Sequence, residues 1–494
     1  ADSSIGFSAD LIYFLSLNPN IMTKILMKAF ALFLFSFTCI ACTNPDHLEE
    51  AGIPILTSSP TLLSNVKANS FFLGWANHGD TTIRVKADKD ILPALTGIKI
   101  DLTAITNTLL NLGNFRLMSI GGALSAGFRD GGLYREGQLT AFPNLVARQM
   151  GLSLNLPLFD PNEGNGSGYK TLINTEPIAS FNLVTNNLAY TDNTANTLRP
   201  YSGKIDSYAF PNMSAWISFI NYPNHDKMGE TFANRFFDNT QKDYSYNYEF
   251  LIKQNCDFFI FEAGMDDLID TFLSGGGGGN ITGINPYSET RGTSLIQALA
   301  DKKAKGILLI VPDVMDLPYF NQITNEKIKK LNVILRVKDD GTAQADREGY
   351  RDFNPAIDKL IPSPYVEKLM RGEIKNIALL NDNEVLSKAS YDDEWIGVSP
   401  VFYNEYKINR KAKENNLPVV DIYGLYKKII AGNYTTDDGI KVDPDWVKGN
   451  FFSADGIYPT AFGQAVIANE VIKTINSFYK LNIPLISTSF FLKK

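Results

Sequence analysis

Short apolar runs alternate with longer amphipathic segments from about residue 115 to the C-terminus. The apolar runs are rich in β-branched and aromatic residues and are bounded by Gly, Pro or Asn, as buried strands of a parallel sheet are. Five runs fit this description: residues 115–120 (FRLMSI), 178–184 (IASFNLV), 257–263 (DFFIFEA), 306–311 (GILLIV) and 417–422 (LPVVDI). The alternation predicts an α/β fold, a three-layer α/β/α sandwich around a central parallel sheet of about five strands.

The segments between the runs predict helices and loops. Residues 140–150 and 460–479 repeat apolar positions at helical spacing. Residues 274–280 (SGGGGGN) predict a flexible loop, and residues 337–352 predict a polar insertion. Because sites in such sheets form at the carboxyl ends of the strands, the turns after the apolar runs are where functional side chains are expected.

The N-terminus has the pattern of an export signal. Residues 29–41 (AFALFLFSFTCIA) follow Lys24 and Lys28, and this stretch is too short to span a bilayer but suits the core of a signal peptide. Cys42 comes next, and the order CIAC resembles the cleavage site of bacterial lipoproteins, which implies that Cys42 carries a lipid. The alternative is an ordinary secretory signal followed by an incidental cysteine.

This pattern divides the chain. We expect upstream sequence and a signal peptide in residues 1–41, and a lipid anchor with a polar tether in residues 42–70. An unassigned N-terminal element (71–110), the α/β domain (111–485) and a C-terminal tail (486–494) follow. A lipid on Cys42 leaves Cys256 without a disulfide partner, so Cys256 is expected to be a buried apolar residue. The expected location is the outer membrane.

Composition narrows the partners. The chain has 494 residues, of which 44% are hydrophobic, so it can bury a large core. Its net charge of -7 includes no basic run that could follow a phosphate backbone, which argues against nucleic-acid binding. No cofactor is expected.

Five blocks, in order, resemble the SGNH/GDSL hydrolases, and in particular their bacterial lipoprotein branch. The blocks are residues 121–127 (GGALSAG), 131–138 (GGLYREGQ) followed by 142–145 (FPNL), 264–267 (GMDD), 311–314 (VPDV) with 318–320 (PYF), and 453–460 (SADGIYPT). The first, third and fifth stand where that family has Gly-Asp-Ser-Leu-Thr-Ala-Gly, Gly-x-Asn-Asp and Asp-Gly-x-His-Pro-Thr. The resemblance implies a flavodoxin-like sheet and a site assembled from these blocks.

The resemblance also implies that most catalytic groups have been replaced. The family needs a serine nucleophile and a histidine base that an aspartate orients. Ala123 stands at the serine position, and its methyl group cannot attack an ester. Tyr458 stands at the histidine position, and a phenol with an ordinary pKa of about 10 is a poor base at neutral pH. Asp455 is retained, without a histidine to orient.

The block that would stabilise an oxyanion is changed as well. Gly122 replaces the aspartate beside the nucleophile, and Asn187 aligns with the glycine of a further block. Asp266 replaces the asparagine, and an ionised aspartate offers only acceptors and repels a developing negative charge. The resemblance therefore implies that catalysis has been lost.

Other groups could rebuild a catalytic site. Ser125 lies two residues beyond Ala123, where we expect it to cap the following helix. The three histidines, His47, His78 and His225, are expected in the tether, the unassigned element and a surface loop. A nucleophile and a base would have to be replaced together, which disfavours a rebuilt site.

Three functional hypotheses follow. The first is a catalytically inactive cell-envelope lipoprotein that serves as a binding or accessory subunit of an outer-membrane complex, with a protein or a glycan as partner. The second is an active or rewired esterase or carbohydrate deacetylase that acts on acyl esters. The third is a binding site in which the carboxylates of Asp266 and Asp455, with that of Asp267, hold Ca²⁺ or a cationic group. Because such aspartates are more often helix caps or solvated loop residues, no metal site is assigned.

Overall fold

The computed structural model describes residues 91–95, 97, 99–109, 114–192, 197–215, 232–236, 246–273, 290–338, 346, 348–381, 383–387 and 399–492, all within one compact unit. The predicted signal peptide, Cys42, the tether, the three histidines and the glycine-rich loop lie outside the described residues. The later part of the unassigned N-terminal element is described. There, Ile105 is fully buried in the larger of the two apolar clusters, which we call the main core. The Asn107 N–H donates to Asp257 Oδ1 at 2.8 Å.

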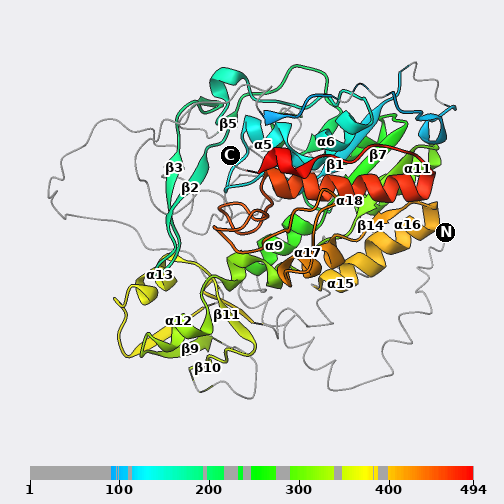
Figure 1. Ribbon diagram of the computed structural model, residues 1–494. Coiled ribbons are helices and arrows are strands. Elements are labelled where there is room, and N and C mark those ends of the chain that lie inside the picture. Colours follow the sequence, from blue (N-terminus) through cyan, green and yellow to red (C-terminus); the bar gives the residue numbers. More distant parts are fainter. Residues whose placement is uncertain are drawn as a thin grey trace, which may run out of the picture. The chain divides into compact units, whose positions relative to one another are not determined.

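A five-stranded parallel sheet forms the centre of the main core (Figure 1). Its strands, in spatial order, are β6 (Ser207–Ala209), β1 (Leu117–Gly121), β7 (Phe258–Glu262), β8 (Lys305–Leu309) and β14 (Val419–Val420). In chain order this sheet reads 2-1-3-4-5, and every neighbouring pair is parallel. The predicted fold class is confirmed, and so are four of the five predicted strands.

The remaining predicted strand is wrong. Residues 178–184 contribute β3 (Ser180–Val184), which pairs antiparallel with β2 (Tyr169–Asn174) in a hairpin outside the central sheet. The fifth position belongs to β6, which is fully buried but only three residues long. A strand of that length leaves no apolar run in the sequence. The apolar residues of β3 instead form a strand that is half-buried over its first three positions.

Helices flank the sheet in two groups, which the right-handed crossover rule assigns to opposite faces. One group is α6 (Phe142–Gln149) and α18 (Ala461–Tyr479), which pack against each other. The other is α8 (Tyr246–Ile252), α11 (Arg291–Asp301) and α16 (Arg410–Asn415). The helices predicted over residues 140–150 and 460–479 are confirmed. No helix among the described residues has both the length and the apolar character needed to cross a bilayer.

A second, smaller core lies between β8 and β14 in the sequence, and we call its residues, 323–387, the small lobe. It contains a three-stranded sheet and a strand pair, with two helices: β9 (Ile334–Lys338), β10 (Tyr350–Asp352), β12 (Ile377–Leu380), β11 (Asp358–Leu360), β13 (Val385–Ser387), α12 (Asn325–Lys329) and α13 (Pro364–Met370). Residues 337–352, predicted as a polar insertion, include the end of β9 and the whole of β10, which pair antiparallel. The polar composition of this stretch concealed its strands.

The β2–β3 hairpin reaches the small lobe from the main core (Figure 1). Ile178, between the two strands, is buried within the apolar cluster of the small lobe. Lys327 of α12 forms an ion pair with Glu176 at 3.0 Å, and its Nζ also donates to the carbonyl oxygen of Thr175 at 3.5 Å. The hairpin therefore links the two cores.

The remaining helices and strands of the described residues are η2 (Thr103–Ile105), α4 (Ala123–Ala126), α5 (Arg135–Leu139), η3 (Pro161–Glu163), β4 (Tyr190–Asp192), β5 (Thr197–Leu198), α9 (Met265–Leu273), η4 (Val314–Asp316), η5 (Pro318–Asn321), α15 (Pro400–Tyr403), the π-helix η6 (Asn404–Asn409), α17 (Ile422–Ile430) and η7 (Thr488–Phe491). The residues predicted as a C-terminal tail pack on the main core. Asn469 of α18 exchanges two hydrogen bonds with the Ile486 backbone, at 3.0 and 2.8 Å.

Candidate functional site

The turns after β1 and β7 meet at the carboxyl edge of the sheet, where the strand order reverses. The Gly122 N–H donates to the carbonyl oxygen and to the Oε2 atom of Glu262, each at 3.2 Å. The next residue, Ala123, donates its N–H to Asp266 Oδ2 at 2.9 Å. The first and third sequence blocks are therefore in direct contact.

Three donors surround the Asp266 carboxylate, and they come from three separate segments. Oδ2 accepts the N–H of Ala123 at 2.9 Å and the N–H of Asn212 at 2.8 Å, while Oδ1 accepts the Tyr458 O–H at 3.0 Å. We call these three groups the donor cluster. Asp266 is 2% exposed and both Ala123 and Tyr458 are 0% exposed, so the carboxylate and these two donors lie away from solvent, whereas Asn212 is partly exposed.

Glycine and asparagine make this close approach possible. A Cβ atom at Gly122 would lie 2.7 Å from Asp266 Oδ2, so any larger residue there would collide with the carboxylate. Gly264, at the start of α9, has a φ of 101°, and a Cβ there would meet the Tyr403 ring at 2.3 Å. Asn212 has a φ of 62°, a left-handed conformation that asparagine tolerates better than most residues do.

A second buried carboxyl lies beside the first. Glu262 ends β7, and its Oε2 accepts the Ser125 O–H at 2.9 Å as well as the Gly122 N–H. Its Oε1 is buried and has no hydrogen-bond partner among the described residues. The expectation that Ser125 caps a helix is wrong, because its hydroxyl points to Glu262 and is 1% exposed.

The retained aspartate has a different task from the one the resemblance implies. Asp455 Oδ1 accepts the N–H groups of Ile457 and Tyr458 at 2.8 and 2.9 Å, and Oδ2 accepts the Gly131 N–H at 3.1 Å. These three bonds fix the turn that carries Tyr458. The Tyr458 ring also packs edge-on against Phe128, with 5.3 Å between the ring centroids. Asp455 thus positions a phenol where the family would have it orient an imidazole.

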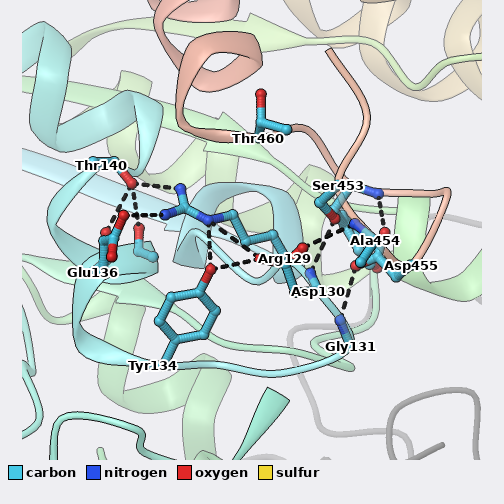
Figure 2. A network of polar contacts seen from close by, with 12 residues as sticks. Arg129, Asp130, Gly131, Tyr134, Glu136, Thr140, Ser453, Ala454, Asp455 and Thr460 are labelled. Atoms are coloured by element: carbon cyan, nitrogen blue, oxygen red, sulfur yellow. Dashed lines mark hydrogen bonds and ion pairs between the residues drawn. The ribbon is translucent and has the colours of Figure 1, made fainter. Parts of the chain in front are cut away.

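A polar network fastens this turn to the segment after α4 (Figure 2). Asp130 donates its N–H to Ser453 Oγ at 2.9 Å and accepts the Ala454 N–H at 2.8 Å. The Tyr134 hydroxyl donates to Asp130 Oδ2 at 2.7 Å, and Arg129 Nε donates to that hydroxyl at 2.7 Å. Since Arg129 is only 4% exposed, the network holds the two segments together from within.

Burial raises the pKa of each carboxyl in the site. The pKa of Asp266 rises to about 6, although its bonds to Ala123 and Tyr458 oppose the rise. The pKa of Glu262 rises to about 7, through burial and then through the charge of Asp266. Burial, followed by the charge of Asp130, raises the pKa of Asp455 to about 6. Burial also raises the pKa of Tyr458 well above its ordinary value, so Tyr458 is a hydrogen-bond donor at neutral pH rather than a base.

The structure brings most of the predicted site residues together, but not Asn187. Gly122 and Ala123 lie against Glu262 and Asp266, and Tyr458 completes the donor cluster. Asn187 lies in the turn after β3, where its carbonyl oxygen accepts the Asn165 N–H at 3.3 Å. Besides Ala123, the residue whose backbone N–H reaches Asp266 is Asn212, in the turn after β6. The error follows from taking residues 178–184 as the second strand of the sheet.

The aspartates proposed as metal ligands do not converge. Asp267 Oδ2 accepts the Ala215 N–H at 2.7 Å, whereas Asp266 and Asp455 contact opposite ends of Tyr458. Within the described ranges, no group of three or more His, Cys, Asp or Glu side chains could hold a metal ion. The carboxyl groups of the site can take up protons and accept hydrogen bonds, and Ala123 presents only a methyl group.

Comparison with known proteins leaves the activity open. No family model matches the chain, and no curated protein matches it. One similar solved structure is described as "a putative SGNH hydrolase from Slackia heliotrinireducens", with 8% sequence identity and a TM-score of 0.28. The match covers 73% of this chain and 98% of the other. A likeness at this level does not extend to activity.

The buried carboxyls predict a stability that falls as the pH rises. Glu262, Asp266 and Asp455 keep their protons in the folded chain at pH values where the unfolded chain has lost them. The free energy of unfolding should therefore decline from about pH 4 to about pH 7, by about 1.4 kcal/mol for each unit of pKa shift. Chemical denaturation at a series of pH values measures this decline.

Glu262→Gln removes one of these groups and should make the decline shallower. The exposed Glu326→Gln is the matched control and should leave the slope unchanged. A wild-type protein that becomes more stable between about pH 5 and pH 8 would contradict the assignment.

Proposed function

We propose that this chain is a cell-envelope lipoprotein with an SGNH-hydrolase-like fold that has lost catalysis and serves as a binding or accessory subunit of an outer-membrane complex. The observation that carries the proposal is the occupation of the donor cluster by the Asp266 carboxylate. In an acyl hydrolase, donors at this edge of the sheet would stabilise the oxyanion of the substrate. Here a resident anion takes all three donors.

The loss of activity does not depend on one residue. Removing a single oxyanion donor typically costs an enzyme about 100-fold to 1,000-fold in kcat. Three donors are engaged here, Ala123 offers a methyl group in place of a nucleophile, and Tyr458 retains its proton. Ala123 and Tyr458 are also 0% exposed, so a substrate could not reach either side chain without rearrangement.

The location and the partner are proposed from the sequence. The apolar residues 29–41, the preceding lysines and Cys42 follow the order of a lipoprotein signal. A lipid on Cys42 and a polar tether would hold the α/β domain near a membrane. The proposed partners are other outer-membrane proteins or a glycan, which would bind the surface of a fold that no longer needs an open catalytic cleft.

One contact favours the second candidate, a rewired esterase. The Ser125 hydroxyl donates to Glu262, whose pKa of about 7 would suit a general base at neutral pH. Ser125 is 1% exposed, however, and Glu262 also bonds to the Gly122 N–H. A buried pair of this kind stabilises the turn, which is why the non-catalytic function ranks first.

Ester turnover should be absent. The purified protein, given p-nitrophenyl acetate or an acetylated sugar, should release product no faster than Ser125→Ala does, and a fluorophosphonate probe should not label it. Restoring the nucleophile alone, with Ala123→Ser, should not produce labelling, because Asp266 still occupies the donors. Labelling of the wild type that Ser125→Ala removes would establish the esterase instead.

Cys42 should carry the lipid. In cells fed a radiolabelled fatty acid, the wild-type chain should incorporate label and sediment with membranes, while Cys42→Ser should do neither. Cys256→Ala, which removes the cysteine that lies outside the signal, is the matched control and should behave like the wild type. Equal labelling of Cys42→Ser and the wild type would refute the anchor.

An accessory subunit should be recovered in a complex. After mild detergent extraction, native electrophoresis of the lipidated protein should reveal a species larger than the monomer, and affinity capture should recover the same partner in stoichiometric amount. Cys42→Ser should lower the recovery, because the chain is no longer held at the membrane. Recovery as a lone monomer would contradict the accessory role.

A further inference from the structure

The donor cluster is held in place by contacts that do not involve Asp266. Two of its members are backbone N–H groups, so their positions depend on the course of the chain at Ala123 and Asn212. The turn before Asn212 is fixed by the Phe210 N–H, which donates to the Gly121 carbonyl oxygen at 3.1 Å. The turn before Ala123 is fixed by the bonds of Gly122 to Glu262.

The third member is equally restrained. Tyr458 is fully buried, its own N–H is bonded to Asp455, and its ring packs against Phe128. Its hydroxyl therefore points to the same place whether or not a carboxylate is there. Donors fixed in advance in this way bind an anion without the cost of ordering them.

We infer that the donor cluster is a binding site for a single carboxylate group, and that the Asp266 side chain is its built-in ligand. The inference rests on the proposed function, since it treats the former catalytic edge as permanently occupied. It specifies the ligand chemistry: a planar group with one oxygen that accepts two N–H bonds and a second oxygen that accepts the Tyr458 O–H.

The size of the site selects among carboxylates. If Asp266→Gly removed the side chain, formate, shifted slightly outward because its carbon atom is not bonded to the chain, could bring its two oxygens near the positions of Oδ1 and Oδ2. Acetate would bring its methyl group into the position of the missing Cβ, too close to the Cα atom of residue 266 for two groups that are not bonded. Formate should therefore bind the variant more strongly than acetate, because nothing larger than the carboxylate itself fits.

The test is chemical rescue of Asp266→Gly in the full-length protein. Thermal unfolding is followed in increasing sodium formate, with sodium chloride at equal ionic strength as the reference. The variant should melt below the wild type, and formate should raise its Tm along a saturating curve, as expected for a ligand that binds only the folded state. The wild type should show no such increase, because its site is already filled.

Asp267→Gly is the matched control. Asp267 is also fully buried and is the next residue of α9, but its described hydrogen bond is to one donor, the Ala215 N–H. Formate should not restore the Tm of this variant beyond what chloride does. Asp266→Asn should fold but respond weakly to formate, because its amide group fills the same space.

Every outcome decides the inference. Saturating rescue of Asp266→Gly by formate, absent in Asp267→Gly, supports it. Equal responses to formate and chloride, equal rescue of both variants, or an Asp266→Gly protein that stays insoluble with and without formate overturns it. Ester hydrolysis is measured separately on the wild type, so a failed rescue and a failed proposed function are distinguishable.

Discussion

The described site depends on one carboxylate that receives hydrogen bonds from three distant parts of the chain. Asp266 joins the turn after β1, the turn after β6 and the loop before α18, whose donors lie 143, 54 and 192 residues from it in sequence. A buried charge is tolerated only when hydrogen bonds compensate its lost hydration. The carboxylate therefore requires the donor cluster.

The residues around Asp266 that differ from the family pattern fit one another. Gly122 leaves the space that Asp266 Oδ2 enters, and Tyr458 supplies a hydroxyl at the right distance from Oδ1. Asp455, the one catalytic position that the resemblance leaves unchanged, holds the Tyr458 backbone in place. Together these residues form a hydrogen-bonded core at the carboxyl edge of the sheet.

Much of the fold and of the candidate site could be predicted from the sequence, and the predictions that were wrong have physical causes. Long apolar runs such as residues 257–263 identified strands, and the block resemblance placed Ala123, Asp266 and Tyr458 in one site. The three-residue β6 could not be recognised, because so short a strand has no visible periodicity, and Asn187 was aligned with the further block because residues 178–184 were taken as the second strand. The bond from Ser125 to Glu262 was missed because it joins residues far apart in the sequence.

The hairpin formed by β2 and β3 limits the order in which the chain can fold. Ile178 can be buried only after the small lobe, which begins at Ile323, has been synthesised. At about 5–20 residues per second, the ribosome needs on the order of ten seconds to supply the intervening segment. During that interval the side chain of Ile178 lacks the apolar partners that bury it in the folded chain.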